Sequence, residues 1–562
     1  AWARFVGRFR WPVALVSFGA TAWLAVFVPQ MEVKMASEDF LFEDDPVRAR
    51  YDAFKAEFGQ DQIASLVISP PEIFDLAFLA KLRAFHEELE DEVPYLEDLT
   101  SLVNVRSTYG REDELLVDDL LEEMPTNEAE LAALRKRALS TPFYRKTGIL
   151  SDDGRETAVR IEVAVYGEPG EAEVEASGGD FSEGFGDGFE DASASEPVDS
   201  GKRPFLSGPE NGRLIETIHS VVERYQGPDF PIRAAGGTMM TYELTKALGR
   251  DVPVFFGGGL VVIGLFLVLL FRRLSPVLLC FAVVVPAAIS TFGLAAILHL
   301  PFSAPSQLIP SFLLAIGVSY SVHLVTIFLR DLGEGRDRLA SLEHALRHSG
   351  LPILMTGLTT TAGLMSFYVA EMKPIQEMGM ISSIGVVVML AYSMILLPAL
   401  MAILPLEARE PRPSPLVDGV LGWLAATSAR HPGRIVGVTA VGVVAAIAAM
   451  MLLYTSSNPI SWFPVEHPYR QASDLVNERF LGTSAIEVVI DTGRENGLHE
   501  PALMERLEAL ERLVDRHKGE GARLSHTSSV LDIVKETPQA LNANDSAFYG
   551  VPEDRRLLAQ EL

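Results

Sequence analysis

Seven stretches of the chain are almost purely apolar, and polar segments of very different lengths separate them. Each stretch holds about 20 residues, the length that an α-helix needs to cross about 30 Å of hydrocarbon. The pattern therefore predicts an α-helical polytopic membrane protein. The seven predicted spans are residues 11–28, 252–271, 276–298, 308–329, 351–370, 378–404 and 435–454.

Basic residues gather on one side of this arrangement. Arg272 and Arg273 lie between the second and third spans, and residues 330–350, between the fourth and fifth, carry further arginines. Short loops rich in Lys and Arg stay in the cytoplasm. The two long acidic segments then lie outside the cytoplasm. They carry most of the net charge of −28, which argues against a nucleic-acid partner.

The first long polar segment, residues 30–250, has the pattern of a small α/β domain. Apolar runs at 62–69, 99–105 and 232–235 are typical of strands, and a helical period runs through 74–90. Residues 167–201 differ, because they are rich in Gly, Asp, Glu and Ser and cannot bury enough apolar surface to fold alone. We expect this insertion to be disordered.

The start of the chain recurs near its end at a constant spacing of 422 positions, and residue types match along the repeat. The matched residues are Arg48, Phe58, Val67 and Ile68 in the first copy and Arg470, Phe480, Val489 and Ile490 in the second. Parallel repeats build transporters from two similar halves. The second copy reaches only part of the length of the first, so we expect a chain that is truncated at its C-terminus.

These patterns together predict the domain organisation. In order, we expect a first span within residues 1–29, an α/β domain at 30–250, a five-span bundle at 251–405, a connector with an amphipathic helix at 406–433, a seventh span at 434–454 and the start of a second domain of the same kind at 455–562.

The fourth span carries polar side chains at membrane depth, where they are costly and mark a pathway by default. Ser319 and His323 are four residues apart and share one helix face. Our candidates for a proton or ion relay are His323, Ser319 and Tyr320, with Ser321 as a partner in the same polar interior. The alternative is that the hydroxyls only permit close helix packing and that His323 makes a helix–helix hydrogen bond.

Two more groups could belong to this pathway. Thr359, Thr360 and Thr361 in the fifth span are candidates for the polar interior, although threonine runs are also ordinary in membrane helices. Glu371, Lys373 and Glu377 stand between the fifth and sixth spans, at the expected outer mouth, where the alternative is a solvated turn.

Motifs of enzymes and metal sites do not occur in the sequence. It lacks the phosphate-binding Gly-x-x-x-x-Gly-Lys-Ser/Thr loop, Gly-x-Ser-x-Gly and His-Glu-x-x-His. Cys280 is the single cysteine, so thiolate metal sites are excluded within one chain, and no calcium-loop spacing is present. We therefore expect no enzyme, no catalytic residue, no cofactor and no metal.

Motifs in three spans resemble one family. They are the run Gly317–His323 (Gly-Val-Ser-Tyr-Ser-Val-His), the run Thr359–Leu364 and a scattered set between Ile375 and Leu400. With the order of spans and soluble segments, they resemble the RND (resistance–nodulation–division) superfamily and, within it, the MMPL-like exporters, whose five-span cluster is similar to the sterol-sensing domain.

This resemblance implies a pump of the bacterial inner membrane, with porter-like domains in the periplasm. It implies export of lipids or other hydrophobic molecules, driven by the proton gradient. It also implies a homo-oligomer, a trimer or dimer, and a periplasmic accessory or lipid-carrier protein as partners.

The sequence departs from the family at one position. An acidic residue, read as the proton carrier, usually precedes the tyrosine of the fourth span, and Ser319 stands there in this chain. A serine hydroxyl does not titrate in this range. Three alternatives follow: His323 carries the proton, the coupling group lies in further spans, or the protein is not proton-driven. Two other functions stay open as well, a lipid- or sterol-sensing receptor without transport and a subunit of multidrug efflux.

Overall fold

The computed structural model describes residues 2–35, 37–59, 63–111, 114–167, 206, 208–406, 415–454, 458–480, 482–483, 485–516, 527–542, 544–552 and 554–561. The chain separates into two compact units. Unit 1 comprises Ala1–Arg48 and Thr245–Asn458, and unit 2 comprises Ala49–Leu244 and Pro459–Leu562. Each unit is described by itself.

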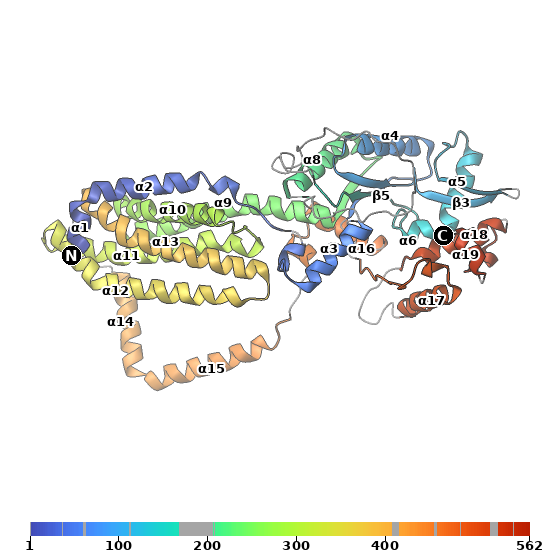
Figure 1. The fold of residues 1–562 in the computed structure, drawn as a ribbon. Helices are drawn as coiled ribbons and strands as arrows, with labels where there is room; N and C mark the ends of the chain where they lie inside the picture. The colour runs from blue at the N-terminus through green and yellow to red at the C-terminus, as the bar shows by residue number, and fades with distance from the viewer. Residues whose placement is uncertain are drawn as a thin grey trace, which may run out of the picture. The chain divides into compact units, whose positions relative to one another are not determined.

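Unit 1 consists of helices, and the prediction of seven spans is confirmed, because the described residues contain seven helices that are long and apolar enough to cross a membrane. They are visible in Figure 1 as α2 (Arg10–Ala25, continued by η1, Val28–Gln30), α9 (Gly237–Phe271), α10 (Leu274–Ile297), α11 (Ile309–Gly333, preceded by η3, Ala304–Leu308), α12 (Arg338–Met365, followed by η4, Ser366–Val369), α13 (Lys373–Ile403) and α15 (Pro432–Met450). The short helix α1 (Trp2–Arg8) precedes α2, and α14 (Pro415–Arg430) precedes α15.

The core of unit 1 forms where α10, α11 and α13 pack together, with α2 and α12 on their outer sides. Val284, Leu313 and Met389 are fully buried there. The outer helices α2, α9, α12 and α15 keep many large apolar side chains exposed. This is the distribution expected for helices that meet lipid rather than water.

Glycines at the helix contacts allow these helices to pack at short distances from one another. A Cβ atom at Gly293 of α10 would lie 2.2 Å from the Leu24 carbonyl oxygen of α2. At Gly317 of α11 it would lie 2.3 Å from Sδ of Met389 in α13. Small residues at such contacts let backbones approach and gain dispersion energy, the main source of helix association in lipid.

The structure corrects the expected loop at 330–350. α12 begins at Arg338, so only 334–337 separate it from α11. The Asp337 side chain caps the helix by accepting the Leu339 amide at 3.1 Å. Leu342 and Ala345 are buried, so this turn of helix has an apolar face that the charged and polar residues around it, Glu343, His344 and Arg347, obscured in the sequence.

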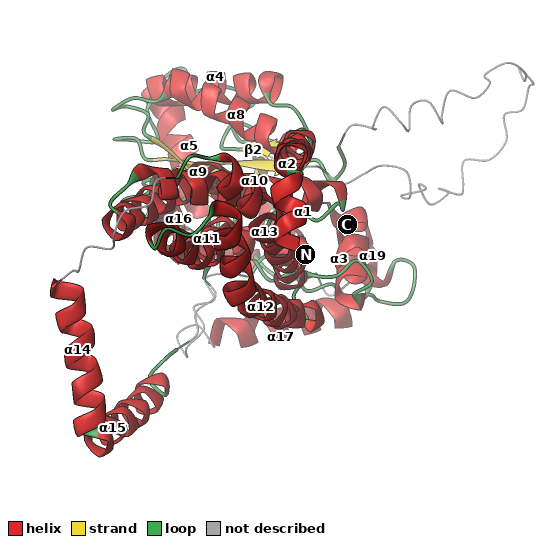
Figure 2. Ribbon diagram, turned by 90° about the vertical axis from the view of Figure 1, so that its left-hand side faces the viewer, coloured by secondary structure: helices red, strands yellow, loops and turns green. Residues whose placement is uncertain are grey.

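Unit 2 contains the strands, drawn yellow in Figure 2, in a sheet of order β2-β5-β1-β6 and a separate two-stranded sheet of β3 and β4. The four-stranded sheet is antiparallel and comprises β1 (Ile63–Ile68), β2 (Leu96–Thr100), β5 (Thr157–Val163) and β6 (Ile232–Gly236). The helices α4 (Leu76–Glu92) and α8 (Gly208–Tyr225) pack on one face of it.

The α/β prediction for the first polar segment is confirmed, with one strand misplaced. We expected a strand over 99–105, whereas β2 ends at Thr100. The chain turns there because Asn104 Oδ1 accepts the Ser101 amide at 2.9 Å and the Ser101 carbonyl accepts the Val105 amide at 2.9 Å.

The internal repeat is visible in local structure. α3 (Pro46–Phe58) and α16 (Pro468–Arg479) begin 422 residues apart, and so do the short helices η2 (Ser37–Phe40) and η5 (Pro459–Trp462). α16 covers the second face of the four-stranded sheet, where Val476 and Phe480 pack with Val67. The match ends after these helices, since β1 is a strand and residues 485–490 are not.

The rest of unit 2 is a smaller assembly around the β3–β4 hairpin. It comprises β3 (Arg106–Arg111), β4 (Glu114–Asp119), α5 (Glu128–Ser140), α6 (Phe143–Lys146), α17 (Pro501–Arg516), α18 (Val530–Leu541), α19 (Arg555–Glu561), η6 (Gly497–His499) and η7 (Ser546–Phe548). α18 packs against both strands of the hairpin.

Two expectations fall on parts that the structure does not describe. The insertion predicted at 167–201 lies outside the described residues except for its first residue, and residues 407–414 of the predicted connector do too. The connector's helix is present as α14. Its position at a membrane surface stays a prediction, as do the domain boundaries.

Candidate functional site

The polar residues of the fourth span divide between two sides of α11. Tyr320 and Ser321 are buried, with 3% and 0% of their surface exposed. Ser319 and His323 share a face, as predicted, but that face is exposed. The structure therefore does not bring the three relay candidates and their expected partner Ser321 into one interior.

The buried face of α11 meets α13 at close range. Gly317 lies against Met389, and Leu313 lies against Gly385, where a Cβ would come within 2.8 Å of it. Continuing this register by one turn places Ser321 of α11 opposite Ser393 of α13. Oγ of each serine is buried and has no hydrogen-bond partner among the described residues, and the same holds for the Tyr320 hydroxyl. Unsatisfied buried hydroxyls of this kind are costly and are expected at sites that hold something polar.

Two threonines of the run in the fifth span donate hydrogen bonds to backbone carbonyls of their own helix, α12. Thr359 Oγ1 donates to the carbonyls of Met355 and Thr356 at 3.0 Å each, and Thr361 Oγ1 donates to Gly357 at 2.8 Å. Thr359 is exposed, and Thr360 and Thr361 are half-buried. No hydrogen bond among the described residues joins the three to the relay candidates of α11.

The expected outer mouth holds a buried acid beside an ion pair. Glu377 in the first turns of α13 is 5% exposed, whereas Glu371 is exposed. Lys373 donates to Glu43 Oε1 at 2.9 Å. This hydrogen bond and the charge of Lys373 lower the pKa of the Glu43 carboxyl below its ordinary value. Exposure of Glu371 fits the solvated-turn alternative, whereas Glu377 is buried on α13, and an outer mouth formed by these residues stays a prediction.

A hydroxyl network crosses the middle of the bundle, and no pattern in the sequence predicts it. The Tyr392 hydroxyl of α13 lies 2.8 Å from Oγ1 of Thr21 in α2 and 2.7 Å from Oγ of Ser290 in α10. Hydrogen bonds between membrane helices contribute about 0.6 kcal/mol each on average and up to about 1.7 kcal/mol. The network fixes three helices to one another at one depth.

A charged cluster lies at the opposite end of the bundle from Glu377. Asp331 in the last turn of α11 is 3% exposed. Its Oδ2 lies 2.6 Å from Nδ1 of His344 in α12 and 3.1 Å from the Arg336 guanidinium. The sequence contained a signal for this cluster, namely an acid directly after an apolar span and a histidine 13 residues later.

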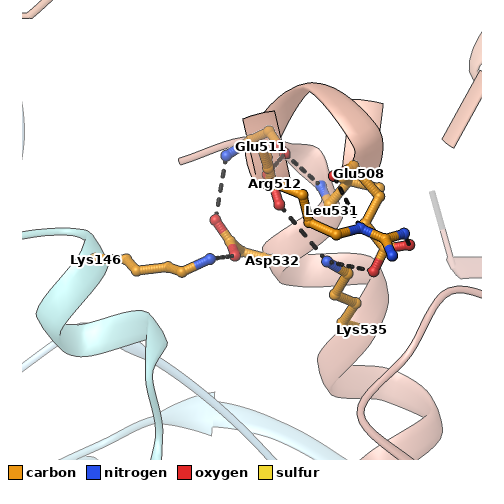
Figure 3. Close-up of polar contacts among 8 residues, drawn as sticks. Lys146, Glu508, Glu511, Arg512, Leu531, Asp532 and Lys535 are labelled. Carbon is orange, nitrogen blue, oxygen red and sulfur yellow. Dashed lines mark hydrogen bonds and ion pairs between the residues drawn. The ribbon is translucent and has the colours of Figure 1, made fainter. Parts of the chain in front are cut away.

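Unit 2 contains a second charged cluster, between α6, α17 and α18. Figure 3 shows Lys146 of α6 reaching Asp532 of α18, which is 1% exposed, and Lys535 of α18 between two acids of α17. The Lys535 ammonium lies 3.3 Å from Glu508 and 3.6 Å from Glu511. Next to them Glu536 is 7% exposed, and its Oε1 has no partner among the described residues.

Residues 206–435 match the model of the MMPL family. These residues contain α9 to α13 and thus the polar helix α11. The predicted MMPL resemblance is confirmed over this range.

Three curated relatives illustrate the likeness. A putative membrane protein of Methanocaldococcus jannaschii is 25% identical over 35% of this chain and 52% of its own length. The mycolic acid-containing lipids exporter MmpL11 of Mycolicibacterium smegmatis is 25% identical over 28% of this chain and 17% of its own length. The hopanoid transporter HpnN of Rhodopseudomonas palustris is 29% identical over 17% of this chain and 11% of its own length. The matches thus span about half or less of each relative.

One solved structure is also similar. It is a crystal structure of a heavy metal efflux pump, with 12% sequence identity and a TM-score of 0.41, and the match covers 80% of this chain and 51% of that chain.

Proposed function

We propose, on the premise that residues 206–435 form an MMPL-family segment, that this protein is a secondary transporter that exports lipids or other hydrophobic molecules from the bacterial inner membrane. The observation that carries the proposal is the coincidence of this segment with the five-helix bundle around α11. Relatives are named as exporters of mycolic acid-containing lipids and of siderophores and as a transporter of hopanoids. These names support transport as the common function and a hydrophobic or amphipathic cargo as the common class.

The structure supports an arrangement suited to such a cargo. Membrane helices with exposed apolar sides, such as α9 with Val262, Leu265 and Leu269, offer surfaces that a lipid can follow. The soluble elements of unit 2 would then stand in the periplasm, and the Arg-bearing turn at 334–337 in the cytoplasm. A homo-oligomer and a periplasmic carrier protein remain proposed partners.

The proposal includes an energy source. We propose the proton gradient, because α11 places ionisable groups inside an apolar unit and no nucleotide-binding motif occurs in the sequence. His323 is a weaker candidate than the sequence suggested. It lies on an exposed face and, like Ser319, has no hydrogen-bond partner among the described residues. Those two facts favour the second candidate function, a lipid-binding sensor that does not transport.

Transport in vesicles tests the two functions. The full-length protein would be reconstituted into liposomes that contain a fluorescent lipid, and release to an acceptor would be followed with and without an imposed pH gradient. A Gly317→Leu variant provides the inactive control, since the added side chain would meet Met389 and Val284 between the helices. Gly258→Ala is the matched control, because nothing lies within 4 Å of a Cβ there.

Gradient-dependent release by the wild type and by Gly258→Ala, absent in Gly317→Leu, would support the exporter. Binding of lipid without release under any gradient would refute export and support the sensor.

A further inference from the structure

The end of the bundle at which α11 meets α12 contains a titratable pair that the relay candidates do not include. The Asp331 carboxylate is almost fully buried, and Oδ2 accepts from both His344 and Arg336. The carboxylate can only accept, so the bond at 2.6 Å requires the hydrogen on Nδ1 of His344. The other ring nitrogen, Nε2, therefore carries the lone pair when the imidazole is neutral.

The two partners differ in exposure to solvent, and protons can therefore reach the pair from the side of His344. The side chain of His344 is 44% exposed, whereas that of Asp331 is 4% exposed. A proton from the solvent at this end can reach Nε2 without opening the bundle. The Nδ1 hydrogen bond then holds the imidazole in place through both states, as a buried carboxylate does for a histidine that gains and loses a proton.

The surrounding charges are paired among themselves. Arg336 also contacts Glu334, and Glu334 contacts Arg330 at 3.2 Å. On the far side of α12, Glu343 pairs with Arg4 of α1 at 3.3 Å. Further charged or titratable groups on these elements are Asp337, which caps α12, Arg338, whose guanidinium reaches the Ala402 carbonyl of α13, Arg347, and His348, whose ring centroid lies 6.1 Å from that of His344.

The net charge of this cluster therefore changes when His344 gains or loses a proton. Two arginines, Arg330 and Arg336, balance two acids, Asp331 and Glu334. Among these five groups His344 is the one with a free ring nitrogen that can accept a further proton. One proton on Nε2 converts a neutral cluster into one with a single positive charge, in the turn that joins α11 to α12.

We propose that the Asp331–His344 pair is a proton-binding site at the cytoplasmic end of the fourth span, through which the transporter exchanges its coupling proton with the cytoplasm. The inference rests on the proposed transport function for its role. The site itself rests on the geometry alone. The buried carboxylate of the pair, Asp331, lies about three turns beyond Ser319 on α11, and the proton is carried by its partner His344 on α12.

A purely structural latch is the rival explanation. Asp331 lies where the dipole of α11 disfavours a negative charge, so partners there are needed for stability alone. The latch and the proton site both predict damage from Asp331→Asn, and that variant does not separate them. They differ over the protonation of Nε2, which a latch does not need.

The first test observes the proton directly and needs no transport. The full-length protein labelled with ¹⁵N-histidine would be studied by solid-state NMR in lipid, and the difference from a His344→Gln variant assigns the ring of His344. We expect Nδ1 to stay protonated across the pH range studied and Nε2 to change from unprotonated to protonated as the pH is lowered. A ring whose Nε2 signal does not change across the range would overturn the proposal.

The second test addresses the role. His344→Gln keeps a donor towards Asp331 but cannot bind a proton, so lipid release in vesicles should lose its dependence on the imposed pH gradient while exchange without a gradient persists. His348→Gln is the matched control, because it removes a neighbouring imidazole that Asp331 does not contact. If His344→Gln responds to the gradient as the wild type does, the proposed role is wrong.

The two tests distinguish a failure of the proposed transport function from a failure of the proposed proton site. A wild type that moves no lipid under any gradient refutes the proposed function, and the role proposed for the pair is refuted with it. The NMR result still decides whether the pair binds a proton.

Discussion

Glu536 gives the sharpest prediction, because it is a carboxyl group buried in unit 2 without a full set of partners. It lies on α18, packed against the β3–β4 hairpin, with 7% of its surface exposed. Burial raises the pKa of Glu536 from its ordinary 4.5 to about 7, and Asp532 adds to the rise, while Arg106 of β3 opposes it. The folded state therefore holds a proton on Glu536 at pH values where the unfolded chain has lost it.

The sign of the effect on stability follows from this difference. Between about pH 4.5 and pH 7 the folded state binds more protons than the unfolded state. The free energy of unfolding of this part of unit 2 therefore falls as the pH rises. Below this window the acid is neutral in both states and costs nothing. Above this window the folded state carries the full cost of the buried charge. Raising the pKa from 4.5 to about 7 corresponds to about 3 kcal/mol of unfolding free energy.

Glu536→Gln removes the charge and keeps the shape of the neutral acid. We expect α18 of this variant to be as well protected as in the wild type near pH 4.5 and better protected at pH 8. Since 1.4 kcal/mol is a factor of ten, about 3 kcal/mol corresponds to about a hundredfold slower exchange.

Hydrogen–deuterium exchange of the full-length protein measures this directly. Peptides from α18 and from β3 would be followed at pH 5 and pH 8 after correction for the intrinsic effect of pH on exchange. Glu505→Gln provides the control, because Glu505 is exposed on the neighbouring helix α17. Wild-type protection of α18 that is equal at both pH values, or a Gln variant that is less protected at pH 8, would refute the reasoning.

Three further predictions concern unit 1. Gly293→Ala should lower the thermal stability of the detergent-extracted protein by about 1–3 kcal/mol, because its Cβ meets a backbone oxygen at 2.2 Å that cannot move as a side-chain end can, and an equal loss in Gly258→Ala would contradict this. Tyr392→Phe should cost about 1–2 kcal/mol in the same assay by removing the hydroxyl that bridges α2 and α10, whereas Tyr368→Phe, on an exposed ring, should cost nothing measurable. His323→Ala should leave both stability and gradient-dependent lipid release near wild-type levels, since the ring is exposed, and a loss of gradient response would restore His323 as the proton carrier.

The sequence predicted those features that depend only on residues close together in the chain. Seven apolar runs became seven spans, because length and composition alone decide whether a helix can cross a membrane. The repeat at a spacing of 422 became two pairs of helices that begin in the same register. Ser319 and His323 share a face, as a spacing of four requires.

Features that depend on contacts between distant segments could not be predicted. The polarity of Ser319 and His323 suggested an inward face, but the sequence does not say which helix the face meets. Gly317 favours the observed orientation, because its missing side chain lets α11 approach Met389 of α13 closely. Tyr392 and Thr21 are 371 residues apart, so nothing in the local pattern pairs them.

The distribution of polar groups along the bundle bears on where energy can enter it. The network of Thr21, Ser290 and Tyr392 in the middle joins three helices through hydroxyls, which exchange hydrogen bonds without a change of charge near neutral pH. Such a network holds helices at a fixed depth but does not respond to a pH gradient. Carboxyl and imidazole groups that are buried or held by hydrogen bonds lie at the two ends instead, Glu377 at one and the Asp331–His344 pair at the other. On the proposed function, a proton gradient would act on this bundle at its ends, where α11, α12 and α13 begin or finish, while the hydroxyl network in the middle holds α2, α10 and α13 to one another.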